Sequence, residues 1–266
     1  MIESFVLKLV TGIALMWLLM PRKEVTDGFF RIQMLVALGL CVLLVLVIQP
    51  DNPAKDTNMI TDAVHPGVRS QAGNQFIRLA QGMAAVLAFA GHIVWKLGRR
   101  LPGAIAIYAV AVLCLLSMVT ASFAGGLNFD SLSFLLSDLA SAAVLGATLT
   151  GMLLGHWYLT TPTMSIGPLS WFTRALAVAA IGRLIMTSIS LSRFGFASQD
   201  LVHLLWLIVR IVGGIIVPLA TAVVVARILK YRNTQSATGV LFAALILVFM
   251  GEMTAALLER DLRIPY

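Results

Sequence analysis

Four ionisable side chains lie inside long apolar segments, where an uncompensated charge is costly. They are Asp138, Arg183, Arg210 and Glu252. A charged group at the centre of a membrane helix costs about 2.5–3.5 kcal/mol, so such groups usually face other helices and mark binding sites or ion pathways. Each lies about six to ten residues from the same end of its segment. Because a helix rises about 1.5 Å per residue, the four are predicted to share one layer of the bilayer.

Three more polar residues extend this layer. Arg78 and Gln81 lie slightly nearer the membrane surface in an earlier segment, and His203 lies at the edge of a later one. Three arginines against two acids give the layer an excess of positive charge, which suits an anionic or carbonyl-bearing ligand. Alternatively, the acids and arginines pair and hold the helices together, because a guanidinium fork can bind a carboxylate at two points. Both interpretations can hold at once.

Two histidines are predicted to lie near the opposite surface of the membrane. His92 and His156 occur in segments that run in the same direction, and each follows a glycine. Two imidazoles at equal depth could ligate a b-type haem axially, since histidine is a common haem ligand. The alternative is that each histidine is hydrogen-bonded at the membrane interface.

The composition requires a bilayer as the solvent for most of the chain. Of the 266 residues, 59% are hydrophobic and only 12% are charged, with a mean hydropathy of +0.94, whereas soluble domains carry about 25% charged residues. The net charge of +7 indicates orientation in such a chain, because Lys and Arg accumulate in cytoplasmic loops. No basic segment is interleaved with aromatic residues in a soluble region, so we expect no nucleic-acid partner.

Apolar runs long enough to cross a membrane, about 20 residues each, occur eight times. They span residues 2–20, 30–48, 75–97, 103–124, 131–156, 168–191, 201–229 and 237–258. The predicted fold is therefore all-α, a single polytopic membrane bundle over residues 1–266 with an outer loop at 49–74. Ten basic residues at one surface against five at the other predict that both termini lie on the outer side.

Small residues indicate where these helices pack closely. The fifth segment carries a stripe at four-residue steps, which consists of Ala143, Ala147, Gly151 and Gly155. Membrane helices approach backbone to backbone along such stripes. In the seventh segment, Gly213, Gly214 and Pro218 predict a close approach and a kink.

Several kinds of chemistry lack their motifs in this chain. No HExxH or HxxxH motif occurs, and Cys41 and Cys114 stand alone in apolar runs, so no metal site is predicted. No GxSxG or Walker loop occurs either, so no catalytic residue is assigned and enzymatic activity is left open.

Three classes of function remain open. The first is a membrane subunit of an electron-transfer assembly that contacts quinone and haem b, with acids and histidines supporting proton uptake or release. The second is a secondary transporter for a small anion, which Arg183 and Arg210 would recognise. The third is a non-catalytic scaffold whose charges only hold the helices together. The expected partners are the lipid bilayer and other membrane subunits, in the inner (cytoplasmic) membrane of a bacterium.

Overall fold

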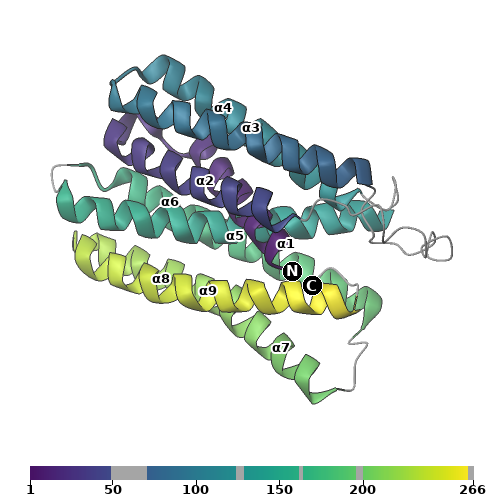
Figure 1. The fold of residues 1–266 in the computed structure, drawn as a ribbon. Helices are drawn as coiled ribbons and strands as arrows, with labels where there is room; N and C mark the ends of the chain where they lie inside the picture. Colours follow the sequence, from purple (N-terminus) through teal and green to yellow (C-terminus); the bar gives the residue numbers. More distant parts are fainter. Residues whose placement is uncertain (49–70, 124–128, 162–163, 196–199, 263–266) are drawn as a thin grey trace.

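The computed structural model describes residues 1–48, 71–123, 129–161, 164–195 and 200–262. Eight helical segments in these ranges are long and apolar enough to span a membrane, which confirms the predicted all-α, eight-span fold (Figure 1). The first six spans are α1 (Ile2–Leu19), α2 (Asp27–Val47), α3 (Gln71–Lys96), α4 (Arg100–Ser122), α5 (Phe129–Thr160) and α6 (Gly167–Phe194). The seventh joins α7 (Leu201–Ile211), η3 (Val212–Ile216) and α8 (Val217–Lys230), and the eighth is α9 (Thr234–Leu262). A short helix, η1 (Arg22–Glu24), follows α1.

The helices begin and end where the sequence interrupts the apolar runs. Pro102 and Pro168 lie in the first turns of α4 and α6, where a missing N–H costs nothing. Gly98 lies in the tight turn between α3 and α4 and has a φ of 69°. Glycine commonly adopts this left-handed conformation just after the end of a helix. The last helix extends to Leu262 instead of residue 258. Residues 49–70 of the predicted outer loop lie outside the described residues, and residues 71–74 form the start of α3.

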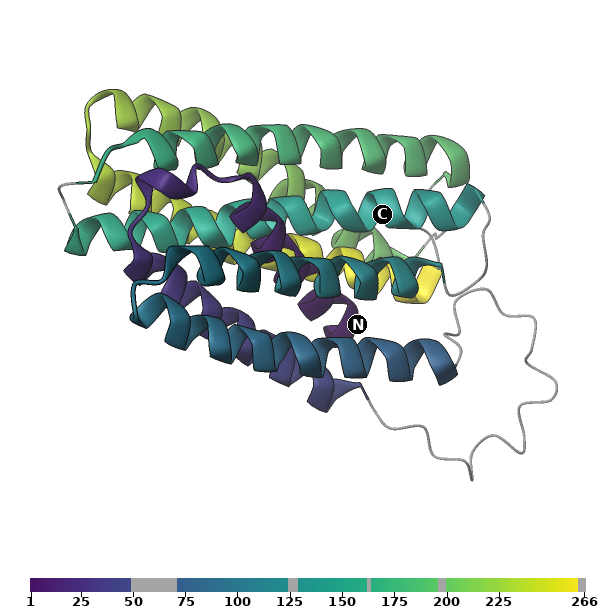
Figure 2. The ribbon, with the colours of Figure 1, turned by 90° about the horizontal axis from the view of Figure 1, so that it is seen from above.

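The shortest described span, α1, is the central helix of the bundle. It packs against α2, α4, α5 and α9, and the longer helices surround it (Figure 2). Its buried residues extend from Phe5 to Trp17. The other spans turn large apolar side chains such as Leu46 and Leu79 outward, as a lipid-facing surface requires.

Two glycines bring the backbones of α1 and α5 into contact. A Cβ atom at Gly12 would overlap the carbonyl oxygen of Ala142, and one at Gly146 would overlap the backbone of Gly12. Glycine allows such an approach because it has no side chain. This crossing fixes the position of α1 beside the helix that carries Asp138.

The predicted small-residue stripe of α5 packs against other helices. Gly151 contacts Phe172 of α6, and Gly155 lies against Thr238 of α9. The stripe therefore packs as predicted, but the closest approach of α5, to α1, lies one residue away from it.

The seventh span changes its helical geometry halfway along its length. Val212–Ile216 forms a π-helical turn, and α7 diverges from the line of α8 there (Figure 1). A Cβ atom at Gly213 would overlap the backbone of α9, and one at Gly251 of α9 would overlap the amide of Gly214. The predicted close approach is thus confirmed. The helical geometry of the seventh span changes at the π turn Val212–Ile216. Pro218 follows this turn and lies in the first turn of α8.

Candidate functional site

A buried cluster of polar side chains is centred on Glu252 of α9. Arg183 of α6 donates to this carboxylate from Nε at 3.4 Å and from Nη2 at 3.3 Å. Arg210 of α7 donates from Nη1 to Oε1 of Glu252 at 3.0 Å. The hydroxyl of Ser141 on α5 donates to Oε2 of the same carboxylate. The three charged side chains are at most 1% exposed. One carboxylate therefore links four helices.

Hydroxyl groups accept further hydrogen bonds from the two arginines. Nη1 of Arg183 donates to the hydroxyl oxygen of Ser137 at 2.6 Å and to its carbonyl oxygen at 3.3 Å. Nη2 of Arg210 donates to Thr187 at 3.3 Å. The Nε of Arg210 is buried without a hydrogen-bond partner among the described residues. Glu252 and these hydroxyls hold the two guanidinium groups in place. The N–H at Nε of Arg210 is the donor of this cluster that has no acceptor among the described residues.

A second cluster lies beside the first and is centred on Lys8 of α1. Its Nζ lies 2.8 Å from an oxygen of Asp138 on α5 and 2.8 Å from an oxygen of Glu259 on α9. Ser122 of α4 donates to the second oxygen of Asp138 at 3.1 Å. The remaining oxygen of Glu259, Oε1, is buried and has no hydrogen-bond partner in the described part of the chain. Lys8 thus joins the carboxylates of Asp138 and Glu259. Oε1 of Glu259 receives no hydrogen bond from the described residues.

Together the two clusters form what we call the charged layer: Lys8, Asp138, Arg183, Arg210, Glu252 and Glu259. It contains three cations and three anions, so its formal charges balance. The predicted excess of positive charge was wrong because the sequence interpretation omitted Lys8 and Glu259 and included Arg78. Ion pairs buried in a medium of low dielectric constant need such a balance, since an unpaired charge there is strongly destabilising.

Two predicted members of the layer lie elsewhere in the bundle. Arg78 is partly buried on α3, which packs mainly against α2 and α4. Gln81, also on α3, is fully buried and donates from Nε2 to Ser117 of α4 at 3.0 Å. The structure therefore brings Asp138, Arg183, Arg210 and Glu252 together and places the polar residues of α3 in a separate contact.

Hydroxyl groups continue from the charged layer along the contact between α5 and α9, which run antiparallel. Ser141 meets Glu252, and fourteen residues along each helix Gly155 meets Thr238. Thr148 lies midway between Ser141 and Gly155 and is buried. The seven-residue spacing keeps these positions on one helix face. The seam therefore carries separated hydroxyl groups, and those of Thr148 and Thr238 donate to the carbonyl oxygens of Val144 and Thr234 in their own helices.

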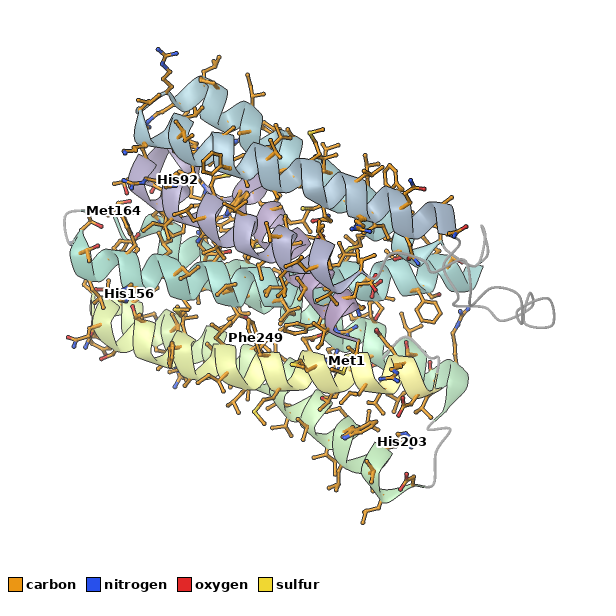
Figure 3. All side chains as sticks on the ribbon, viewed as in Figure 1. Met1, His92, His156, Met164, His203 and Phe249 are labelled. Atoms are coloured by element: carbon orange, nitrogen blue, oxygen red, sulfur yellow. The ribbon has the colours of Figure 1, made fainter. Side chains whose placement is uncertain are left out.

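His203 lies near the end of the bundle at which α7 begins (Figure 3). Its ring nitrogens are 3.9 Å from a carboxylate oxygen of Asp200 and 3.7 Å from one of Asp261. Its ring also meets Trp206 edge to face, with a centroid distance of 5.3 Å. His203 thus lies among acids near the start of α7 and the end of α9, and its part in a ligand site stays a prediction.

The two histidines proposed as haem ligands make no described contact with each other. Nδ1 of His92 lies 3.1 Å from the carbonyl oxygen of Arg31 on α2, and His156 on α5 is exposed. Both lie toward the end of the bundle opposite His203 (Figure 3). The hydrogen-bonded interfacial role fits the environment of His92, and haem ligation stays a prediction.

Sequence analysis missed Lys8 and Glu259 for different reasons. Lys8 lies inside the first apolar run, so counting its depth in the same way as for Asp138 could have identified it. Glu259 lies one residue beyond the predicted end of the last span, although α9 includes it. Its spacing of seven residues from Glu252 was the available signal, because such positions share a helix face.

The described residues contain no group of three or more His, Cys, Asp or Glu side chains that could hold a metal ion. The chain matches no protein-family model, no curated protein and no solved structure. The charged layer holds acidic and basic side chains within 4 Å of one another, a spacing that acid–base chemistry requires.

Proposed function

We propose that this protein is a proton-transfer subunit of a membrane electron-transfer assembly. The observation that carries the proposal is the position of Lys8, whose Nζ lies 2.8 Å from each of two carboxylates, Asp138 and Glu259. An ammonium group held between two carboxylates can pass a proton to either one within hydrogen-bond distance. Acid–base groups at this distance are what proton transfer requires, and ionisable residues inside membrane spans often form such relays.

Incomplete hydrogen bonding supports a relay over a static lock. Glu259 Oε1 and Arg210 Nε of the charged layer are buried without hydrogen-bond partners in the described residues. Buried polar atoms are nearly always bonded, to protein or to an ordered water. Glu259 Oε1 can therefore accept a hydrogen bond from water or a transferred proton, and the N–H at Nε of Arg210 can donate to a water beside the ion pairs.

The arrangement of the polar groups suggests a direction for the transfer. Glu259 lies nearest the end of α9, Lys8 and Asp138 follow, and Glu252 lies two turns deeper on the same face as Glu259. From Glu252 the seam through Thr148 and Thr238 leads toward the opposite surface. Protons would enter or leave the layer at Glu259 and be exchanged with a redox partner in the assembly.

The anion-transporter hypothesis receives less support from these contacts. The two arginines that were to recognise an anion share one carboxylate, Glu252, and the layer has no excess charge to attract a second anion. The π turn at Val212–Ile216 would suit a hinge between α7 and α8. A transporter would need such a hinge. The scaffold hypothesis uses the same ion pairs but does not require proton movement.

The contacts with quinone and haem b stay predictions of the sequence. They are tested by absorption spectra of the oxidised and dithionite-reduced protein, purified in mild detergent from haem-replete cells. A sharp reduced α-band that disappears in both His92→Ala and His156→Ala would support haem ligation. A featureless spectrum would remove haem from the proposal and leave proton transfer to be tested separately.

Proton transfer is tested by reconstituting the purified protein into liposomes and measuring the internal pH after a potassium diffusion potential is imposed. The proposal predicts proton flux in the wild type and its loss when Glu259 becomes glutamine. A stable, reconstituted wild type without flux above that of empty liposomes would favour the scaffold hypothesis.

A further inference from the structure

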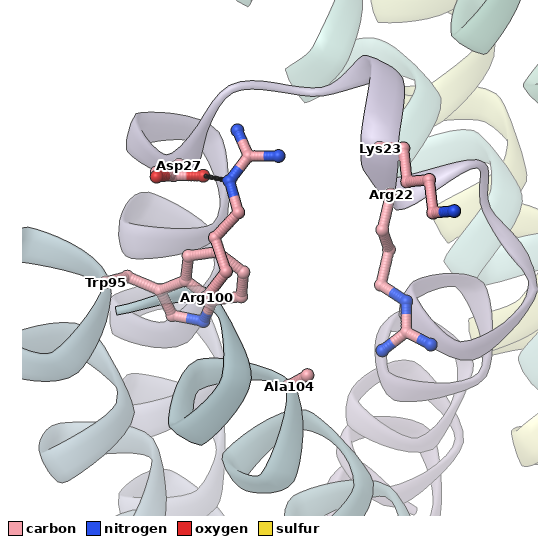
Figure 4. A pocket seen from close by; sticks show the side chains of 6 residues that line it. All are labelled: Arg22, Lys23, Asp27, Trp95, Arg100 and Ala104. Carbon is pink, nitrogen blue, oxygen red and sulfur yellow. Dashed lines mark ion pairs between the residues drawn. The ribbon is translucent and has the colours of Figure 1, made fainter. Parts of the chain in front are cut away.

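A pocket opens at the end of the bundle where η1 follows α1 and α3 turns into α4 (Figure 4). It has a volume of about 150 Å³ and is lined by Arg22, Lys23, Asp27, Trp95, Arg100 and Ala104. Arg22 and Lys23 of η1 form one wall, and residues from the adjoining ends of α2, α3 and α4 form the other. Three basic residues and one acid line it, so the lining has an excess of two positive charges.

Two hydrogen-bond donors in this pocket have no partner. Nε1 of Trp95 and Nη1 of Arg22 are both buried and unbonded among the described residues. Trp95 is only 5% exposed, and its ring is stacked on Phe30 with a centroid distance of 4.7 Å. A Cβ atom at Gly103 would lie 2.6 Å from the indole ring. The indole is therefore fixed by packing, and its N–H is left for a group outside the described chain.

The guanidinium of Arg22 is also fixed in place. Its Nη2 donates to the hydroxyl of Tyr108 at 2.5 Å, and its carbon lies 4.8 Å from the centroid of the Tyr108 ring. The acid of the pocket, Asp27, pairs with Arg100 at 2.9 Å. The positive charges of Arg22 and Lys23 are therefore not balanced within the lining, and an anion would complete the site.

We propose that this pocket binds the phosphate group of an anionic glycerophospholipid. Arginine and lysine are the usual phosphate ligands in proteins, and basic pockets between membrane helices bind anionic headgroups on the cytoplasmic side. The positive-inside count assigns this end of the bundle to that side. The phosphate accepts hydrogen bonds from Nη1 of Arg22 and Nε1 of Trp95, with Lys23 adding charge.

The surroundings of the pocket favour a lipid over free phosphate as the source of this group. Leu101 and Ile105 on α4 are 78% and 61% exposed, close to the pocket residues Arg100 and Ala104. Each follows a pocket residue in sequence, so acyl chains can pack on the outer surface of α4 at the level of the pocket. Free phosphate would leave this apolar surface unused.

The test is native mass spectrometry of the detergent-solubilised protein titrated with phosphatidylglycerol, with phosphatidylcholine as the uncharged comparison. Removing two charges with Arg22→Gln and Lys23→Gln should weaken phosphatidylglycerol binding roughly thirtyfold, at about fivefold for each charge near the headgroup. Trp95→Phe removes the N–H donor and keeps a smaller aromatic ring at this position, so it should weaken binding several-fold, and its melting temperature is measured to confirm that it folds. The matched control, Arg227→Gln with Lys230→Gln, removes two exposed charges from the same end of the bundle and should change binding less than twofold.

Three results would contradict the proposal. Equal losses in the pocket variant and the control would show that phosphatidylglycerol is attracted only by the general surface charge. Displacement of phosphatidylglycerol by millimolar inorganic phosphate, with phosphate retained in the spectrum, would show that the free ion is the ligand. The Trp95→Phe variant keeps both charges, so an unchanged affinity in this variant would contradict the assigned hydrogen bond.

Discussion

The guanidinium of Arg210 lies over Gly214, one turn further along the seventh span, in the space that a side chain at Gly214 would occupy. From this position its Nη1 reaches Glu252 of α9 at 3.0 Å. Gly214 belongs to the π turn of Val212–Ile216, a geometry often found at functional sites. The missing side chain and the altered helix together allow the arginine to reach the carboxylate.

Replacing Gly214 with alanine is therefore expected to separate Arg210 from Glu252 while leaving both charges buried. Breaking a buried ion pair typically costs about 3–5 kcal/mol, so the variant should unfold at a clearly lower temperature in detergent. Gly239→Ala is the control, because a Cβ there meets nothing within 4 Å and alanine in a helix gains about 0.5–1 kcal/mol. Unchanged stability of Gly214→Ala would contradict the role given to this glycine.

Lys8→Met should be strongly destabilising because it leaves Asp138 and Glu259 close together without a cation between them. Adding Asp138→Asn to this variant removes one of the facing carboxylates and should recover part of the loss. A double-mutant cycle of thermal stability measures the coupling, which we expect to exceed about 1 kcal/mol for residues in direct contact. Lys96→Met changes an exposed lysine and is the matched control. Additive effects of the Lys8 and Asp138 changes would refute their pairing.

Gly12→Ala should push α1 away from α5, because the new methyl group would overlap the carbonyl oxygen of Ala142. Overpacking of this kind costs about 1–3 kcal/mol or more, and here the obstacle is backbone that cannot rotate away. Gly39→Ala on α2 places its methyl in open space and should be neutral or stabilising. Thermal unfolding of the two variants tests this crossing, and equal melting temperatures would mean that α1 is not held at Gly12.

The number and type of the spans could be predicted from the sequence because a bilayer demands long apolar helices, whatever their neighbours. The depth of Asp138, Arg183, Arg210 and Glu252 followed from the same rule, since position along a helix fixes depth. Both predictions depend on one helix at a time. They needed no knowledge of how the helices pack.

The choice of neighbouring helices could not be predicted in this way. Arg78 has a similar depth to the other arginines but lies on α3, which packs mainly against α2 and α4, whereas the layer's residues lie on α1, α5, α6, α7 and α9. Lys8 enters the layer because α1 is central, which depends on the crossing at Gly12 and Gly146. Helical periodicity indicates the face of a residue, but only tertiary packing decides what that face meets.

The measurement that tests the central claim most directly is proton flux into liposomes that contain the purified protein. Wild type, Glu259→Gln and Glu24→Gln are compared under the same imposed membrane potential, with equal protein content confirmed for each. Glu24 is an exposed acid in η1 that accepts a hydrogen bond from Ser165, so its variant makes the same chemical change outside the charged layer.

The account predicts that wild type and Glu24→Gln conduct protons alike, and that Glu259→Gln loses at least about nine-tenths of the flux. This loss is expected because glutamine fills the same space but cannot exchange a proton with Lys8. Flux in Glu259→Gln equal to wild type, or no flux in the wild type, would contradict proton transfer through the charged layer.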